Sequence, residues 1–338
     1  MLRKTWNRFS RFTRRSFLAK ATILAVGWKL SPLLSGERLF AEESSEVGVI
    51  RTMDRKEAVR RALRLTPPPD LTGKKVLIKP NFNTADPAPG STHNDTLATL
   101  IDEIWERGAR EVIIGERSGP PVTQEVMREK GIFELAEEKG VRIVNFDLLK
   151  EDELVHFQDD RLHWKDGFLV PKVLYDVDHI IAVGCLKTHQ FNGVFTMALK
   201  LAVGIIPREG TTYMRELHGS PDMRKMIAEI NLAYRPDLFI IDGVEAFTSG
   251  GPATGQRVDA GTTLCSRDPV AIDAVGVSIL KHLGSTPGIM NIPVFQQEQI
   301  ARAAEIGLGA SVPDQIRLVT DEPGQDNLIK ELETILRS

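Results

Sequence analysis

From about Lys74 onward, short apolar runs alternate with longer amphipathic stretches. Runs such as "KVLIK", "EVIIGE" and "DHIIAVGCL" have the length of strands, and the stretches between them show the apolar spacing of helices. This order is typical of a parallel sheet, because each helix returns the chain to the starting edge for the next strand. The sequence therefore predicts an α/β fold with a single doubly wound, mostly parallel sheet and helices on both faces.

One more polar span, residues 148–166, interrupts the alternation and is expected to form a small insertion. The stretch "VFTMALKLAVGII" contains a single charge, and its apolar content favours a well-buried helix. We find no internal repeat and no low-complexity linker in the sequence. We therefore expect one α/β domain over residues 74–338, preceded by a lead-in over residues 42–73.

Composition argues against several classes of function. A net charge of −3 gives no electrostatic reason to bind nucleic acid. Cys185 and Cys265 are too few to hold an iron–sulfur cluster from this chain alone; they either pair in an oxidising compartment or remain buried thiols. No apolar run approaches the ~18 residues that a membrane-spanning helix needs, so no span is expected in the mature protein.

The N-terminus has the features of an export signal. The run "TRRSFLAK" matches the twin-arginine pattern, and a short, weakly apolar segment follows it. We expect residues 1–41 to be a signal peptide with cleavage after Ala41, and the twin-arginine export machinery to carry the folded protein to the periplasm. The alternative is a basic amphipathic arm that binds a partner.

Polar residues stand where the predicted strands end. Lys79 and Asn81 follow "VLI", Lys187 and His189 follow "IIAVGCL", and Asp242 follows "FII". The carboxyl ends of parallel strands meet at one edge of the sheet, where ligands bind in open α/β folds. We therefore predict one site at this edge. The alternative is that strand ends are polar only because they reach water.

These residues suit a small anionic ligand. The lysines are point charges for a phosphate or carboxylate. The charged form of His189 is disfavoured beside a lysine, so this histidine can act as acid/base or ligate a metal. We assign catalysis to His189, Lys187 and Asp242, and substrate binding to Lys79, Asn81, Lys200, Gly251 and Gly255. A divalent metal is a candidate cofactor, with Asp242, Glu245, Asp273 and His189 as its candidate ligands.

Two of these charges lie in apolar surroundings. A buried lysine must be paired or neutral, so Lys200 reaches the edge, pairs with an internal acid or extends to the surface. Asp273, in "VAIDAVG", is a candidate partner for one of the lysines. The glycine-rich segment "TSGGPATG" can form a backbone nest for an anion, but it lacks the pattern of a P-loop.

Several sequence blocks occur in an order that resembles one bacterial and archaeal family, domain of unknown function family 362. The blocks are "VLIKPNF…STHND", "GAREVIIGERSG", "DHIIAVGCLKTH", "MALKLAVGIIP", "DLFIIDGVEAFTSGGPATG" and "SRDPVAIDAVG". The resemblance covers residues 74–308 and implies a single α/β domain. The family's signature positions correspond here to Lys79, Asn81, Lys187, His189, Lys200, Gly204, Asp242, Gly251, Pro252, Gly255, Asp268 and Asp273.

Some relatives carry an added ferredoxin-like segment, which implies electron transfer and a redox partner. This chain has no such cysteine-rich segment. Our leading hypothesis is an exported enzyme that acts on a small anionic substrate. The alternatives are a redox or metallocentre accessory protein linked to iron–sulfur chemistry, and a periplasmic ligand-binding module without catalysis.

Overall fold

The computed structural model describes residues 44–208, 211–324 and 326–338. Within them, ten strands form one sheet in the order β12-β1-β11-β9-β7-β2-β3-β4, with β8 paired to β7 and β10 paired to β9. These strands are β1 (Ser45–Arg51), β2 (Lys75–Lys79), β3 (Glu111–Glu116), β4 (Arg142–Asn145), β7 (His179–His189), β8 (Val194–Thr196), β9 (Leu238–Gly250), β10 (Gly255–Asp259), β11 (Thr262–Ser266) and β12 (Ile316–Val319).

The centre of the sheet is parallel. Strands β4, β3, β2, β7 and β9 run in the same direction, whereas β11 is antiparallel to both of its neighbours, β9 and β1. Strands β2, β3 and β7 are buried on both faces, which explains why their sequences contain continuous apolar runs. The predicted α/β fold with a mostly parallel sheet is therefore confirmed.

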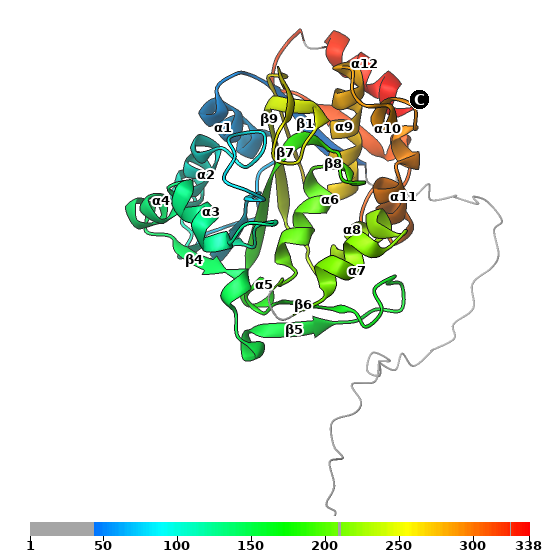
Figure 1. Cartoon of the computed structure of the whole chain (residues 1–338). Helices are drawn as coiled ribbons and strands as arrows, with labels where there is room; N and C mark the ends of the chain where they lie inside the picture. The colour runs from blue at the N-terminus through cyan, green and yellow to red at the C-terminus, as the bar shows by residue number, and fades with distance from the viewer. Residues whose placement is uncertain (1–43, 209–210, 325) are drawn as a thin grey trace, which may run out of the picture. The chain divides into compact units, whose positions relative to one another are not determined.

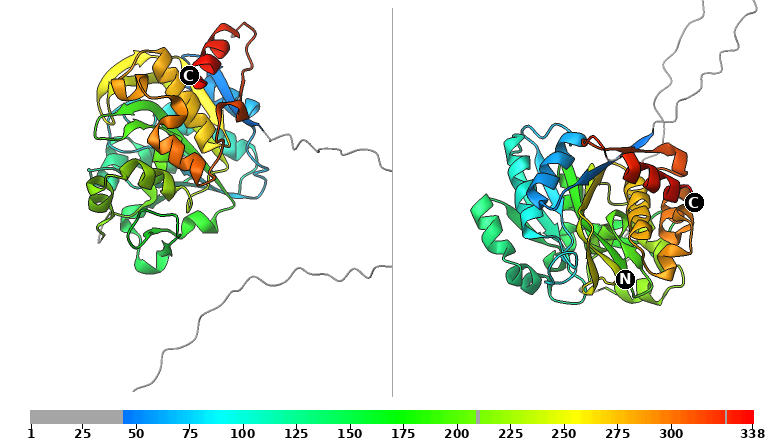
Figure 2. Two further views of the ribbon diagram at one scale, coloured as in Figure 1. Left: turned by 90° about the vertical axis from the view of Figure 1, so that its right-hand side faces the viewer. Right: turned by 90° about the horizontal axis from the view of Figure 1, so that it is seen from above.

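Helices cover both faces of the sheet (Figures 1 and 2). One group packs against the face of the sheet that carries Val76 and Ile78, and it consists of α1 (Arg55–Leu65), α2 (Asn94–Glu106), α3 (Thr123–Glu129) and α4 (Ile132–Lys139). The other group includes α6 (Ala198–Leu201), α8 (Met223–Ile230), α9 (Pro269–His282) and α11 (Glu298–Glu305). Alternate residues of β2 belong to the two cores: Leu77 joins one, and Val76 and Ile78 join the other.

The predicted insertion forms a separate two-stranded sheet from β5 (Leu154–Phe157) and β6 (Phe168–Pro171). The described part of the predicted lead-in, residues 44–73, contributes β1 and α1 to the main fold. The buried residues of β1 lie between β11 and β12, so this segment is part of the sheet itself. The predicted signal peptide over residues 1–41 lies outside the described residues.

The expected long helix over "VFTMALKLAVGII" is wrong. Its first residues form β8, which pairs antiparallel with the end of β7. The rest form the four-residue α6, followed by a 3₁₀ turn over Ala202–Ile205. Helical periodicity cannot separate a buried helix from a short strand plus a short helix when nearly every residue is apolar. In the described part of the chain, no helix has the length and apolar character needed to cross a membrane.

Candidate functional site

The backbone places the predicted residues at one edge of the sheet. Strands β3, β2, β7 and β9 are consecutive neighbours, and the carboxyl ends of these parallel strands lie at the same edge. In the register between β7 and β9, Cys185 pairs with Asp242. The side chains, however, separate into groups with different partners.

Lys79 forms a buried ion pair and does not face a ligand site. Its side chain is 1% exposed, and its Nζ donates to Glu116 Oε1 at 2.7 Å and to the Pro80 carbonyl at 2.8 Å. Burial lowers the pKa of Lys79 and raises the pKa of Glu116, while the ion pair acts in the opposite direction on both. The backbone at Gly204 covers the pair so closely that a Cβ there would lie 2.7 Å from the lysine Nζ. Lys79 is thus paired with Glu116 inside the protein, and its role in binding an anion stays a prediction.

The Asp242 carboxylate also forms hydrogen bonds inside the protein, with Arg55 and Thr96. Its Oδ2 accepts hydrogen bonds from Thr96 Oγ1 at 2.7 Å and Arg55 Nε at 3.1 Å, and the same arginine reaches Glu245 at 2.7 Å. Asp242 Oδ1 accepts from the backbone N–H of Val244 at 3.1 Å. These carboxylates neutralise Arg55 of α1, so the structure does not support the predicted roles of Asp242 in catalysis or of both acids in metal binding.

The other predicted binding residues support the loops around Lys187. Asn81 donates through Nδ2 to the Gly90 carbonyl at 3.4 Å. Gly251 has a φ of +73°, and a Cβ there would lie 2.1 Å from the Thr188 carbonyl oxygen. A Cβ at Gly255 would lie 2.3 Å from a backbone carbonyl oxygen. Close backbone packing therefore requires glycine at both positions, and their role in binding an anion stays a prediction.

Lys187 is a buried cation held by backbone carbonyls. Its side chain has no exposed surface, and its Nζ donates to the carbonyls of Gly90 at 2.5 Å and Pro252 at 2.9 Å. Within residues 44–208, 211–324 and 326–338, no carboxylate lies within ion-pair distance of it. Burial lowers the pKa of Lys187 to about 8, and the charge of Lys130 adds to this effect.

Lys200 lies on α6 near the same edge. Part of its side chain is exposed, and it makes no hydrogen bond or ion pair with any residue that the structure describes. Burial, together with the positive charges of Lys187 and Arg117, lowers the pKa of Lys200 to about 8. Lys187 and Lys200 are therefore close enough for their charges to repel. Neither forms an ion pair with a carboxylate among the described residues, although the charge of Asp86 partly offsets that of Lys187.

His189 completes this group. Burial lowers its pKa to about 2, and the charges of Lys200 and Lys187 contribute, so the imidazole is neutral near pH 7. Its Nδ1 is buried without a hydrogen-bond partner among the described residues, and Gly193 passes directly over this atom. The exposed ring of Phe191 lies edge-on at 6.0 Å from the imidazole ring. We call Lys187, Lys200 and His189 the lysine–histidine cluster.

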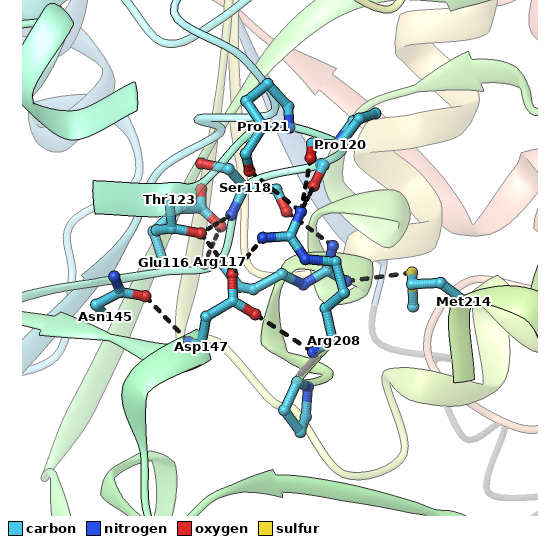
Figure 3. A network of polar contacts seen from close by, with 12 residues as sticks. Glu116, Arg117, Ser118, Pro120, Pro121, Thr123, Asn145, Asp147, Arg208 and Met214 are labelled. Atoms are coloured by element: carbon cyan, nitrogen blue, oxygen red, sulfur yellow. Dashed lines mark hydrogen bonds and ion pairs between the residues drawn. The ribbon is translucent and has the colours of Figure 1, made fainter. Parts of the chain in front are cut away.

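An arginine network fixes the chain that follows Lys200 (Figure 3). Arg117 donates to the carbonyls of Val203 at 2.5 Å and Ile206 at 2.9 Å. Arg208 pairs with Asp147 at 3.0 Å and also donates to backbone carbonyls of the loop after β3. Because burial lowers the pKa of Arg117 only to about 10, its guanidinium stays charged at neutral pH and adds to the positive potential at the cluster.

The proposed metal ligands do not converge. Both oxygens of Asp273 accept backbone N–H groups of α6, at 2.7 Å from Ala198 and 3.1 Å from Leu199. In the described part of the chain, no three His, Cys, Asp or Glu side chains are arranged to hold a metal ion. Cys185 and Cys265 are free, buried thiols, and burial raises the pKa of both, that of Cys265 to about 11.

Two surface hollows lie away from the cluster. One, of about 410 Å³, is lined by residues of β2, β3 and β4 and by the insertion, including Lys75, Arg142 and Glu153. The other, of about 590 Å³, borders the start of β1 and includes Arg267. Neither contains a member of the lysine–histidine cluster, so we place the candidate site by its chemistry rather than by the size of a hollow.

Comparison with known proteins identifies the family. The sequence profile described as domain of unknown function, DUF362, matches residues 76–278. The chain belongs to the DUF362 family. A curated relative of this DUF362 protein is a thylakoid-associated protein of Synechocystis sp., 27% identical over 214 residues, which cover 62% of this chain and 64% of the relative. The match thus spans less than two thirds of that relative.

Two solved structures are similar to the DUF362 chain at low identity. The lactate racemase apoprotein from Thermoanaerobacterium thermosaccharolyticum has a TM-score of 0.41 and 16% identity, covering 62% of this chain and 52% of its own. A protein from Thermotoga maritima has a TM-score of 0.40 and 18% identity, covering 56% of this chain and 50% of its own. The chain therefore spans about half the length of each solved relative.

Three residues near the cluster of this DUF362 protein were not predicted from its sequence. Arg117, Lys130 and Phe191 affect the charge or the surroundings of the cluster. Arg117 directly follows Glu116 at the end of β3, and Phe191 follows His189 by two residues. A search that included a few positions beyond the end of each predicted strand would have found these two residues. Lys130 lies in a loop after α3, and nothing local in the sequence distinguishes it.

Proposed function

We propose that this protein is an enzyme that binds a small anionic substrate, a carboxylate or a phosphate ester, at the lysine–histidine cluster. The observation that supports this proposal is the pair of neighbouring ammonium groups of Lys187 and Lys200, neither of which forms an ion pair with a carboxylate among the described residues. Unpaired buried cations raise the free energy of the folded protein. A bound anion lowers this free energy by supplying the missing countercharge.

The three side chains have different roles in this proposal. Lys200 is partly exposed and contacts the anion, whereas Lys187 lies beneath the loops and contributes mainly its charge. His189 supplies a neutral imidazole, which accepts a proton from the substrate once the bound anion offsets the repulsion of the lysines. The expected result is a rise in the pKa of His189 when the anion binds.

A second candidate function is a ligand-binding module without catalysis. The observation that favours it is the pKa of His189, because a value of about 2 is far below the pH at which a general base works well. If the anion raises this pKa only slightly, His189 serves as a neutral hydrogen-bonding group. Titration of the histidine by NMR with and without bound anion separates the two functions.

We also propose that residues 1–41 direct export by the twin-arginine route to the periplasm. The proposal is supported by the sequence "TRRSFLAK" and its basic surroundings. Replacement of Arg14 and Arg15 by lysine should retain the protein in the cytoplasm, as measured by cell fractionation. Undiminished export of that variant would contradict this proposal without affecting the anion site.

Isothermal titration with sulfate, phosphate, acetate and malonate tests the anion site. The variant Lys200→Met should bind the preferred anion at least about 10-fold more weakly, because a charge-assisted contact contributes about 1.5–3 kcal/mol. Lys281→Met is the matched control, because Lys281 donates only to the Met290 carbonyl, at 3.3 Å. Equal affinities of wild type and Lys200→Met would show that the anion binds elsewhere.

A further inference from the structure

We propose that Asp273 is a positioning residue that sets the place of Lys200 and thereby controls anion affinity. This inference rests on the proposed function. It starts from a helix that is too short to be stable alone: α6 has four residues, and its N-cap residue Met197 makes no side-chain capping hydrogen bond. The N–H groups of its first turn therefore need an acceptor from elsewhere in the fold.

Asp273 supplies this acceptor from the middle of α9. Its Oδ1 accepts from Ala198 N at 2.7 Å, and its Oδ2 accepts from Leu199 N at 3.1 Å. Lys200 is the next residue in the chain. The two helices also pack closely, because a Cβ at Gly276 would lie 2.2 Å from the Met197 sulfur. The carboxylate thus holds the turn that presents the Lys200 side chain.

This arrangement is costly for the fold. Asp273 is 0% exposed, and burial raises its pKa to about 7. The Gln299 amide on α11 faces the carboxylate and favours its charged form, whereas the charge of Asp268 disfavours it. A serine or threonine at the N-cap would satisfy the same N–H groups without burying a charge. A costly buried group that holds a candidate ligand residue is the pattern expected of a functional site.

The two hydrogen bonds make the position of Lys200 sensitive to protonation. Each carboxylate oxygen accepts one N–H, so a proton on either oxygen turns an acceptor into a donor and removes one bond. Anion affinity should then rise with pH as Asp273 ionises and fall again as Lys187 and Lys200 lose their protons near pH 8. The expected profile has a maximum between these two transitions.

Sulfate is the probe, because its charge does not change across this range. We would measure its affinity from about pH 5.5 to about 9.5 for wild type, Asp273→Asn and Ser278→Ala. The asparagine should bind sulfate about 10-fold more weakly at the optimum, the loss expected for one hydrogen bond to a charged group, and its profile should lack the acidic decline. Ser278→Ala is the matched control, since the buried Ser278 hydroxyl donates only within α9, at 3.0 Å to Ala274.

The outcomes separate the two proposals. If wild type binds none of the anions tested, the proposed function fails. If wild type binds sulfate and Asp273→Asn keeps both its affinity and its acidic decline, the positioning role fails. Should the asparagine variant not fold, hydrogen exchange of wild type decides. The protection factor of the Leu199 amide must fall between about pH 8 and about pH 6, and constant protection overturns the inference.

Discussion

Replacement of the buried Lys187 by methionine tests whether this residue is an uncompensated cation. Methionine has a similar length and carries no charge, so the substitution removes the ammonium group with little change in volume. The pKa of Lys187 falls from an ordinary 10.5 to about 8 in the folded protein. At 1.36 kcal/mol per pH unit, this difference corresponds to about 3 kcal/mol.

The sign follows from proton binding. Between about pH 8 and 10.5, the folded state has released the Lys187 proton while the unfolded state still holds it, so the free energy of unfolding rises with pH. Below pH 8 both states are charged, and the full penalty of the buried charge is present. The wild type should therefore gain about 3 kcal/mol relative to Lys187→Met across this interval. The carbonyls of Gly90 and Pro252 lose a donor in the variant, which shifts the difference by the same amount at every pH.

Urea unfolding at several pH values from about 7 to about 10.5 measures this difference. Lys139→Met is the control, because an ion pair with Asp102 raises the pKa of Lys139, and its difference curve should not rise with pH. The Lys187→Met variant should also lose most of its anion affinity. A flat difference curve for Lys187 would refute the view that the fold holds an unpaired charge there.

Two further predictions concern residues beside the cluster. Gly204→Ala should lower the free energy of unfolding by about 2–3 kcal/mol in urea, because its Cβ would lie 2.6–2.7 Å from the charged atoms of a buried ion pair; Gly219→Ala, with no atom within 4 Å, should be harmless. Benzoate should bind several-fold more tightly than acetate through the 62% exposed ring of Phe191. Phe191→Ala should remove that preference in calorimetry while Tyr175→Ala keeps it, and a preference that survives in Phe191→Ala would exclude the ring.

The positions at which the predicted strands end located the edge of the sheet correctly, but they could not show which charged side chains pair with each other there. Lys79 and Lys187 follow similar apolar runs, yet Lys79 pairs with Glu116, whereas Lys187 donates hydrogen bonds to carbonyls. Glu116, which pairs with Lys79, comes from the neighbouring strand β3. Arg55, which donates a hydrogen bond to Asp242, precedes it by 187 residues. Such contacts depend on which helices and strands pack together, and this packing cannot be predicted from the local sequence.

The amino-acid sequence by itself determined the α/β class and the edge at which polar residues collect, because periodicity and strand direction act locally along the chain. Only the tertiary structure decided which charges stay unpaired. Whether Lys187 and Lys200 find an acid depends on side chains brought together from distant segments, and the energy of a buried charge depends on those neighbours. The same packing placed Asp273 against α6, a contact between residues 74 and 75 positions apart.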